Sequence, residues 1–147
     1  MWWGHSDVRN GAWALQGPSQ TIQRSELSAL LHAACWSDER LVVRTDSEWV
    51  AGGASLMAAN DGPGRNWQHR DLWAKLHRRL KARCGTDTQV DIETVRAHRT
   101  KEDVEKGVIS EEDREGNEQA DRLAKEASST FCCPSAAIFQ VLIAHML

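Results

Sequence analysis

The stretch Leu41-Val42-Val43-Arg44-Thr45-Asp46-Ser47 decides the fold predicted for this chain. Its apolar and β-branched residues are typical of a buried strand, which ends at an acid followed by a hydroxyl residue. In open α/β sheets, ligands bind beyond the carboxyl ends of the strands, so Asp46 lies where chemistry is expected. Taken alone, Asp46 is more simply explained as a residue that caps the helix beginning near Glu48. Other motifs in the sequence are needed to distinguish these roles.

Composition predicts one soluble globular domain. The 147 residues are 41% hydrophobic, which is enough for a single core. A net charge of −3 gives no global sign of a nucleic-acid binder, so such a role has to rest on local clusters of basic residues. Cys35, Cys84, Cys132 and Cys133 contain no C-x-x-C pair and indicate reduced thiols. They favour an intracellular protein, in the nucleus or the cytoplasm, without a zinc site.

Neither end of the chain predicts a membrane protein. Residues 1–6 lack both the basic start and the continuous apolar run of a secretory signal. The apolar stretch 131–147 contains Pro134, Gln140 and His145, and it is shorter than the roughly 20 residues that span a bilayer. We therefore expect no membrane partner.

Three further strands are predicted from alternating or turn-bounded apolar residues. They cover 10–15, a short edge strand at 20–23, and 89–95, where Val90, Ile92 and Thr94 alternate along the strand. The last of these strands leads into Arg96-Ala97-His98.

Helical spacing of apolar residues predicts helices over 24–36, 48–59 and 71–83. Thr21 or Ser25 is a suitable N-cap for the first. The third has an apolar face and a basic face, which carries Lys75, Arg78, Arg79, Lys81 and Arg83. Most such faces are simply solvated, and contact with nucleic acid is the competing interpretation.

The C-terminal part is predicted to begin with a polar, acid-rich mobile loop over 101–115. A helix follows from about Asn117, with Asp121 one turn further on. Pro134 is expected to open a last amphipathic helix. These features divide the chain into a domain at 1–128 and a C-terminal extension at 129–147.

Three acids stand at separated but informative positions: Glu26 in the first helix, Asp46 at a strand end, and Asp121 early in a late helix. Each has an ordinary explanation, since an acid in the first turns of a helix also favours the helix dipole. Their contexts are Q-R-S-E-L-S-A-L-L, V-R-T-D-S and G-N-E-Q-A-D-R-L-A-K-E-A. Together with D-L-W at 71–73 and V-R-A-H at 95–98, they closely resemble the type 1 ribonuclease H family over roughly 10–127.

The resemblance implies a three-layer α/β fold with a mixed central sheet flanked by helices. It implies endonucleolytic hydrolysis of the RNA strand of RNA–DNA hybrids by a two-metal-ion mechanism. Clustered carboxylates repel one another unless cations neutralise them, and oxygen ligands suit Mg²⁺ or Mn²⁺. Two such ions activate water and stabilise the leaving oxygen of a phosphodiester.

Carried over residue by residue, the resemblance makes Glu26, Asp46 and Asp121 metal ligands. His98 would assist proton transfer or product departure. Gln23 would read the minor groove, where 2′-hydroxyls distinguish RNA from DNA, and Thr21 would contact a backbone phosphate. Arg78 and Arg79 on the basic helix would add salt-dependent phosphate contacts.

Two departures from the family pattern affect these expectations. The family's first, central strand ends in an acid within D-G-S or D-G-A, and nothing here matches it; Asp7 is the only nearby carboxylate. The loop between His98 and Asn117 is also longer than in compact bacterial-type enzymes. We therefore expect a fragment of a retroelement-type reverse-transcriptase polyprotein, with low activity on its own. Its strand at 41–45 would have an open edge, filled poorly by residues 1–6 or not at all.

Two other functions compete with hybrid cleavage. One is a catalytically inactive relic that still binds nucleic acid, because the first catalytic Asp is not found. The other is a structural or interaction domain that binds no nucleic acid.

Overall fold

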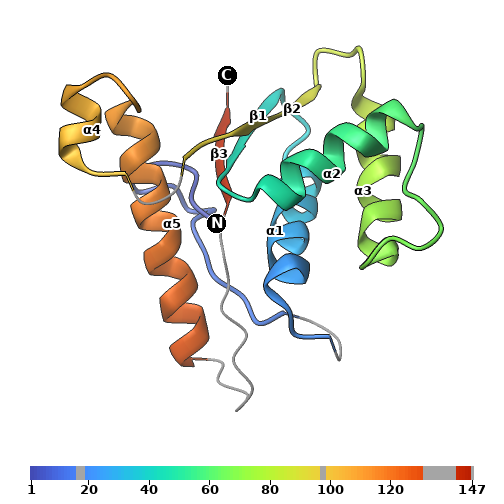
Figure 1. Cartoon of the computed structure of the whole chain (residues 1–147), viewed down its shortest axis with the longest axis horizontal. Helices are drawn as coiled ribbons and strands as arrows, with labels where there is room; N and C mark the ends of the chain where they lie inside the picture. Colours follow the sequence, from blue (N-terminus) through green and yellow to red (C-terminus); the bar gives the residue numbers. More distant parts are fainter. Residues whose placement is uncertain (16–18, 97–98, 131–141, 147) are drawn as a thin grey trace.

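The computed structural model describes residues 1–15, 19–96, 99–130 and 142–146. Its elements in chain order are α1 (Ile22–Trp36), β1 (Leu41–Thr45), α2 (Glu48–Ala59), α3 (Arg70–Arg83), β2 (Val90–Thr94), α4 (Lys101–Glu105), α5 (Glu111–Thr130) and β3 (Leu142–Met146). Figure 1 shows α1 and α2 on one side of the sheet, with α3 beside α1, and α5 on the other side. The expected mixed sheet between helical layers is therefore confirmed.

The described sheet has three strands in the order β2-β1-β3. β1 and β2 are parallel, with Leu41 opposite Val90 and Thr45 opposite Thr94. β1 and β3 are antiparallel, with Leu41 opposite Met146 and Thr45 opposite Leu142. β1 is thus the central strand, and its residues Leu41, Val43 and Thr45 are almost completely buried.

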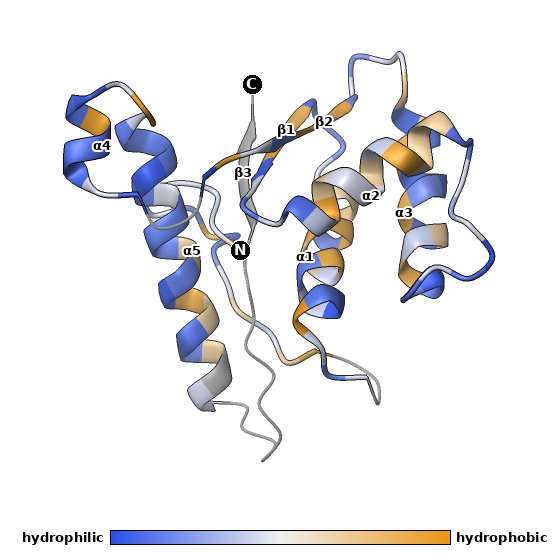
Figure 2. Cartoon of the chain, viewed as in Figure 1, coloured by the Kyte–Doolittle hydropathy of each residue, from blue (hydrophilic) through white to orange (hydrophobic). Residues whose placement is uncertain are grey.

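The core lies between the sheet and its helices. Leu27 and Leu30 of α1, Val50 and Met57 of α2, and Leu76 of α3 are all at most 1% exposed. The buried residues that α5 adds to the core are small, namely Ala120 and Ala124, and the partly buried Leu123 packs against the core. Figure 2 shows that hydrophilic residues predominate along α5, so this helix covers the sheet with a narrow apolar stripe. Among the described helices, none has both the length and the apolar character needed to cross a membrane.

The N-terminal segment packs into the core, and the strand expected at 10–15 does not form. Met1, Trp2 and Trp3 are at most 6% exposed. The Met1 amine donates to the Gly11 carbonyl at 2.8 Å, and the Gly11 amide donates back to the Met1 carbonyl at 3.1 Å. Large indole side chains bury area efficiently, so packing of Trp2 and Trp3 adds to these backbone contacts in holding the segment. The edge strand expected at 20–23 is also wrong, because Ile22 and Gln23 open α1.

The mobile loop expected at 101–115 is replaced by α4 and the start of α5. Thr100 and Asp103 form a reciprocal capping box at the start of α4. The Ser110 hydroxyl accepts from the Asp113 amide at 3.0 Å and donates to the Asp113 carboxylate at 2.6 Å. These local caps make helices out of an acid-rich stretch whose composition favours disorder, and α5 begins at Glu111 instead of near Asn117.

β3 corrects two expectations at once. The sequence predicts a helix from Pro134 onward, but Leu142–Met146 form a strand. Residues 131–141 lie outside the described part of the chain, so the expected helix is not tested there. The edge of β1 expected to be open is paired along its full length with this strand. Pairing is favoured because a buried central strand has peptide groups on both edges that need hydrogen-bond partners. A short apolar run such as L-I-A-H-M fits either a helix or a strand, so only the partner decides.

Candidate active site

Asp46 directly follows β1, at the carboxyl end of the central strand. The next residue, Ser47, is the N-cap of α2, because its side chain accepts from the Val50 amide at 3.3 Å. The Ser47 amide in turn donates to the Thr45 hydroxyl at 3.1 Å. These two bonds fix a tight connection between the strand and the helix. Asp46 therefore lies between two residues, Thr45 and Ser47, whose side chains both accept hydrogen bonds from the backbone.

Glu26 of α1 reaches the same place from the other side of the connection. Its carboxylate accepts a 2.5 Å hydrogen bond from the Ser47 hydroxyl, and the residue is only 5% exposed. Ser25 and Leu27, its neighbours on α1, are also buried, so the helix presents this part of its surface to the interior. The structure thus brings Glu26 and Asp46 together, as the sequence predicted for this pair.

The environment of Glu26 disfavours its charged form. Burial raises the pKa of the Glu26 carboxyl above its ordinary value, and the nearby charge of Asp46 raises it further. The hydrogen bond from Ser47 opposes both effects, since it stabilises the carboxylate. A buried carboxylate beside a second acid is a typical environment for a functional group.

Asp121 is placed differently. It is half-buried on α5, one turn after the buried Asn117, and α5 lies across the sheet from α1 (Figure 1). Within the described ranges, no three His, Cys, Asp or Glu side chains form a group suited to a metal ion. The predicted convergence is therefore seen for Glu26 and Asp46, and Asp121 is not brought into a group of three with them.

Glu26 and Asp46 supply carboxylate oxygens, the type of ligand that a divalent cation such as Mg²⁺ needs. Mg²⁺ is commonly bound by one or two carboxylates, with water and substrate phosphate oxygens completing its octahedral shell. The raised pKa of Glu26 points the same way, because a cation beside the two acids would offset both the burial cost and their mutual repulsion. A second ion requires a further carboxylate, and Asp121 is the candidate for it.

Thr21 has a structural role at the start of α1. Its hydroxyl accepts from the Arg24 amide at 3.2 Å, which makes it the N-cap, and it lies 2.9 Å from His69 Nε2. Arg24 then forms a two-point ion pair with Asp71 at 3.0 and 2.9 Å. These contacts join the first turns of α1 and α3. Gln23, in the same turn of α1, is exposed.

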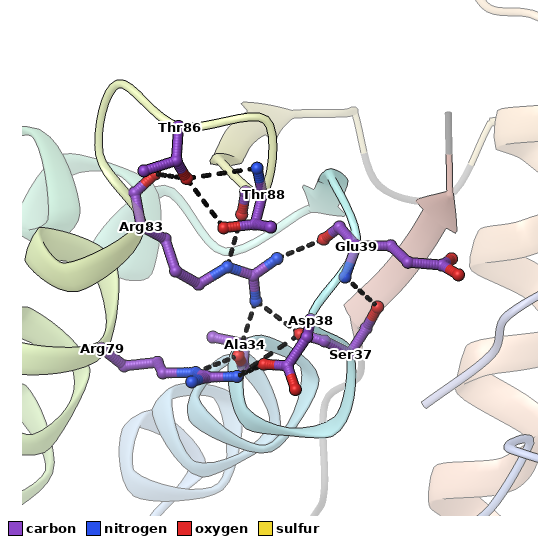
Figure 3. A network of polar contacts seen from close by, with 8 residues as sticks. All are labelled: Ala34, Ser37, Asp38, Glu39, Arg79, Arg83, Thr86 and Thr88. Atoms are coloured by element: carbon purple, nitrogen blue, oxygen red, sulfur yellow. Dashed lines mark hydrogen bonds and ion pairs between the residues drawn. The ribbon is translucent and has the colours of Figure 1, made fainter.

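Two of the five residues on the basic face expected on α3 make contacts inside the protein. Arg83 is 3% exposed, and its guanidinium donates to the carbonyls of Ala34, Ser37, Glu39 and Thr88 (Figure 3). Arg79 donates to the Ala34 carbonyl at 2.8 Å and to Asp38 at 2.5 Å. These two arginines satisfy the carbonyls at the end of α1.

The basic residues of α3 therefore do not all face solvent, because Arg83 is buried; contact of Arg78 and Arg79 with the substrate stays a prediction. Lys81 is paired with Asp61 at 2.7 Å. Arg78, the other arginine predicted to bind substrate, is exposed. The spacing of apolar residues identified the polar side of α3, but this spacing could not show that the end of α1 packs against that side.

Two other sequence candidates have different outcomes. His98 lies outside the described residues, so its role stays a prediction. Asp7 is paired with Arg9 at 2.5 Å and also accepts from the Arg9 amide at 2.8 Å. This local turn gives the Asp7 carboxylate a structural role.

Sequence reasoning missed Ser47, the residue that connects the two acids. The available signal was a hydroxyl residue in the N-cap position directly after Asp46, with a second acid predicted nearby. It also missed a cavity of about 780 Å³ beside α5, whose lining includes Asp121, Arg122 and Lys125.

Comparison with known proteins tests the resemblance directly. The sequence model of the RNase H family matches residues 3–129, which is most of the chain. No match was found among curated proteins or among solved structures. The family match covers the described sheet up to β2, all five described helices except the last residue of α5, and all three candidate acids. The chain therefore belongs to the ribonuclease H family, as a type 1 ribonuclease H domain.

Proposed function

We propose that this chain hydrolyses the RNA strand of RNA–DNA hybrids in a reaction that depends on a divalent cation. Membership of the family supports this reaction in general, and its members generally use ions such as Mg²⁺. The observation that carries the proposal is the pairing of Glu26 and Asp46 through Ser47, at the carboxyl end of the central strand.

In this proposal Glu26 and Asp46 hold one cation, and Asp121 contributes to a second. Mn²⁺ is an alternative to Mg²⁺, because both accept carboxylate and water oxygens. When bound, such ions activate water and stabilise the leaving oxygen of a phosphodiester. The protein's own contribution is to fix the carboxylates: Ser47 orients Glu26, and the capped start of α2 orients Asp46.

The remaining residues have supporting roles. Gln23 is exposed on α1, three residues before Glu26, and would contact the minor groove of the hybrid. Recognition of 2′-hydroxyls in a wide, shallow minor groove would distinguish the RNA strand without reading its sequence. Thr21 would contact a phosphate while it caps α1, and His98 would move a proton or assist departure of the product.

Cleavage of a labelled RNA–DNA hybrid tests the proposal. We expect Mg²⁺-dependent products from the wild-type chain, none in EDTA, and none from the Asp46→Asn variant. The Asp87→Asn variant is a matched control, because Asp87 is exposed in the turn before β2. Cleavage of double-stranded DNA at the same rate would contradict recognition of the RNA strand.

A second function is favoured by one observation. Among the described residues, the acids do not form a group of three. A domain that binds hybrid or double-stranded nucleic acid without cleaving it would have this property. Tight binding without any Mg²⁺-dependent product, at high enzyme concentration and long incubation, would favour this alternative.

A further inference from the structure

The cavity beside α5 has a charge opposite to that of the whole chain. Five of its lining residues are cationic: Arg96, Arg99, Arg114, Arg122 and Lys125. Three are acidic: Glu118, Asp121 and Glu126. The lining therefore has a net charge of +2, whereas the whole chain has a net charge of −3. An open cavity of about 780 Å³ with this balance concentrates anions locally.

One end of the cavity lies near the carboxyl ends of β1 and β2, where Asp46 also lies. The Val95 amide donates to the Thr45 carbonyl at 2.9 Å, so the ends of β1 and β2 lie side by side. Asp46 directly follows Thr45, and Arg96 directly follows Val95. From there the other wall extends along α5 as far as Ser129. The basic lining therefore leads away from the acids along one side of the domain.

Three of the cations can be reached from solvent. Arg96 and Lys125 are exposed, and the Arg122 side chain is 58% exposed. Arg122 is paired with Glu126 at 2.6 Å, but an exposed pair within one helix contributes little stability and can be exchanged for another anion. Arg114 differs, since its side chain is only 13% exposed and is held by Glu111 and Glu118.

We propose that the cavity along α5 binds the phosphate backbone of the nucleic acid and leads it to the acid pair. A phosphate backbone fits Arg96 together with Arg122 and Lys125 of α5, because phosphate contacts need positive charge but no base recognition. This inference rests on the proposed function. It replaces α3 as the main basic surface, since Arg83 of α3 is buried and Arg79 contacts the end of α1. In addition, α3 lies on the opposite side of the molecule from α5 (Figure 1).

Two triple variants remove the same charge from the two surfaces. The α5 variant combines Arg96→Gln, Arg122→Gln and Lys125→Gln. The control combines Arg65→Gln, Arg70→Gln and Lys75→Gln, three exposed positions in α3 and the segment before it. Binding of a fluorescent RNA–DNA hybrid is measured by anisotropy in EDTA, which prevents cleavage, over a series of salt concentrations. Thermal unfolding checks that each variant is folded.

We expect the α5 variant to bind about 10-fold or more weakly and to lower the salt slope by about two to three, since each phosphate contact contributes about 0.9 to that slope. The control should bind within about twofold of wild type. If the triple variant does not fold, Lys125→Gln alone should lower the slope by about one. Equal losses in both triple variants, or no loss in the α5 variant, would overturn the inference.

The outcomes also separate this inference from the proposed function. If the α5 variant binds like wild type and wild type cleaves the hybrid with Mg²⁺, the inference fails and the function stands. If wild type neither binds nor cleaves the hybrid at low salt, both fail.

Discussion

The Ser47 hydroxyl donates a 2.5 Å hydrogen bond to the Glu26 carboxylate, joining residues 21 positions apart in the chain. The same hydroxyl oxygen accepts from the Val50 amide and so caps α2. One side chain therefore sets both the direction of α2 and the position of a buried acid next to Asp46. This relationship links the stability of the fold to the geometry of the candidate active site.

Ser47→Ala should lower the free energy of unfolding by about 1–2 kcal/mol, because it removes an N-cap and leaves Glu26 without its donor. Urea unfolding measures the change. Ser55→Ala is the matched control, since Ser55 is exposed on α2 and its hydroxyl donates to the Ala51 carbonyl one turn earlier in the same helix. The control should stay within about 0.5 kcal/mol of wild type. Equal stability of the two variants would show that Ser47 does not hold the site.

Glu26→Gln should make the metal-free protein more stable at neutral pH. The folded-state pKa of Glu26 is raised, so the folded protein binds its proton more tightly than the unfolded chain does. Stability is therefore lost as the pH rises from the ordinary Glu value of 4.5 through the raised folded value, and the variant lacks this loss. Urea unfolding at acidic and neutral pH in EDTA measures it. A variant less stable than wild type at both pH values would contradict the assignment.

With Mg²⁺ present, the wild-type protein should gain stability, whereas the Glu26→Gln variant should gain little. A cation held by Glu26 and Asp46 binds only the folded state, so it should raise the unfolding midpoint of wild type in proportion to the logarithm of its concentration. Glu26→Gln should show little of this effect. An identical Mg²⁺ effect on both proteins would place the ion elsewhere.

Several elements could be predicted from the sequence because their signals are local. β1 matches the expected strand at 41–45, α2 begins and ends where expected, and α1 and α3 differ from the prediction by at most two residues. Apolar spacing and hydroxyl caps such as Thr21 are read within a few positions of the chain. The acids Glu26 and Asp46 were found in the same way, through their local contexts.

The features that were missed depend on contacts between distant segments. β3 is a strand because β1 offers a partner about 100 positions earlier in the chain. Arg83 is buried because the end of α1 and the turn after it present the carbonyls of Ala34, Ser37 and Glu39 to it, which no pattern within α3 reveals. The caps Thr100 and Ser110 were local signals, but the acid-rich composition around them favoured a loop.

Arg83→Gln should destabilise the protein by about 3 kcal/mol or more, because a charged donor that serves four carbonyls is removed from a buried position. Arg78→Gln is the control on the same helix, and it should change stability by less than about 0.5 kcal/mol, since Arg78 is exposed. Chemical denaturation compares the two. Similar small effects would mean that the carbonyls at the end of α1 find other partners.

Gly53→Ala and Gly52→Ala should have opposite effects although the residues are adjacent in α2. A Cβ at Gly53 would lie 2.5 Å from the ring of Trp73, whereas a Cβ at Gly52 meets no atom within 4 Å. Overpacking should cost about 1–3 kcal/mol at Gly53, and Gly52→Ala should gain about 0.5–1 kcal/mol of helix propensity. Thermal unfolding distinguishes them. Equal shifts would contradict the close packing of α2 on Trp73.

The central claim is that Glu26 and Asp46 form a cation-dependent site for hybrid cleavage, and a single-turnover assay with enzyme in excess tests it most directly. A labelled RNA–DNA hybrid is incubated with the wild-type, Asp46→Asn or Asp87→Asn chain, in Mg²⁺ or EDTA. We predict Mg²⁺-dependent cleavage of the RNA strand by wild type and Asp87→Asn, and none by Asp46→Asn. Cleavage by a folded Asp46→Asn chain at the wild-type rate would contradict the claim.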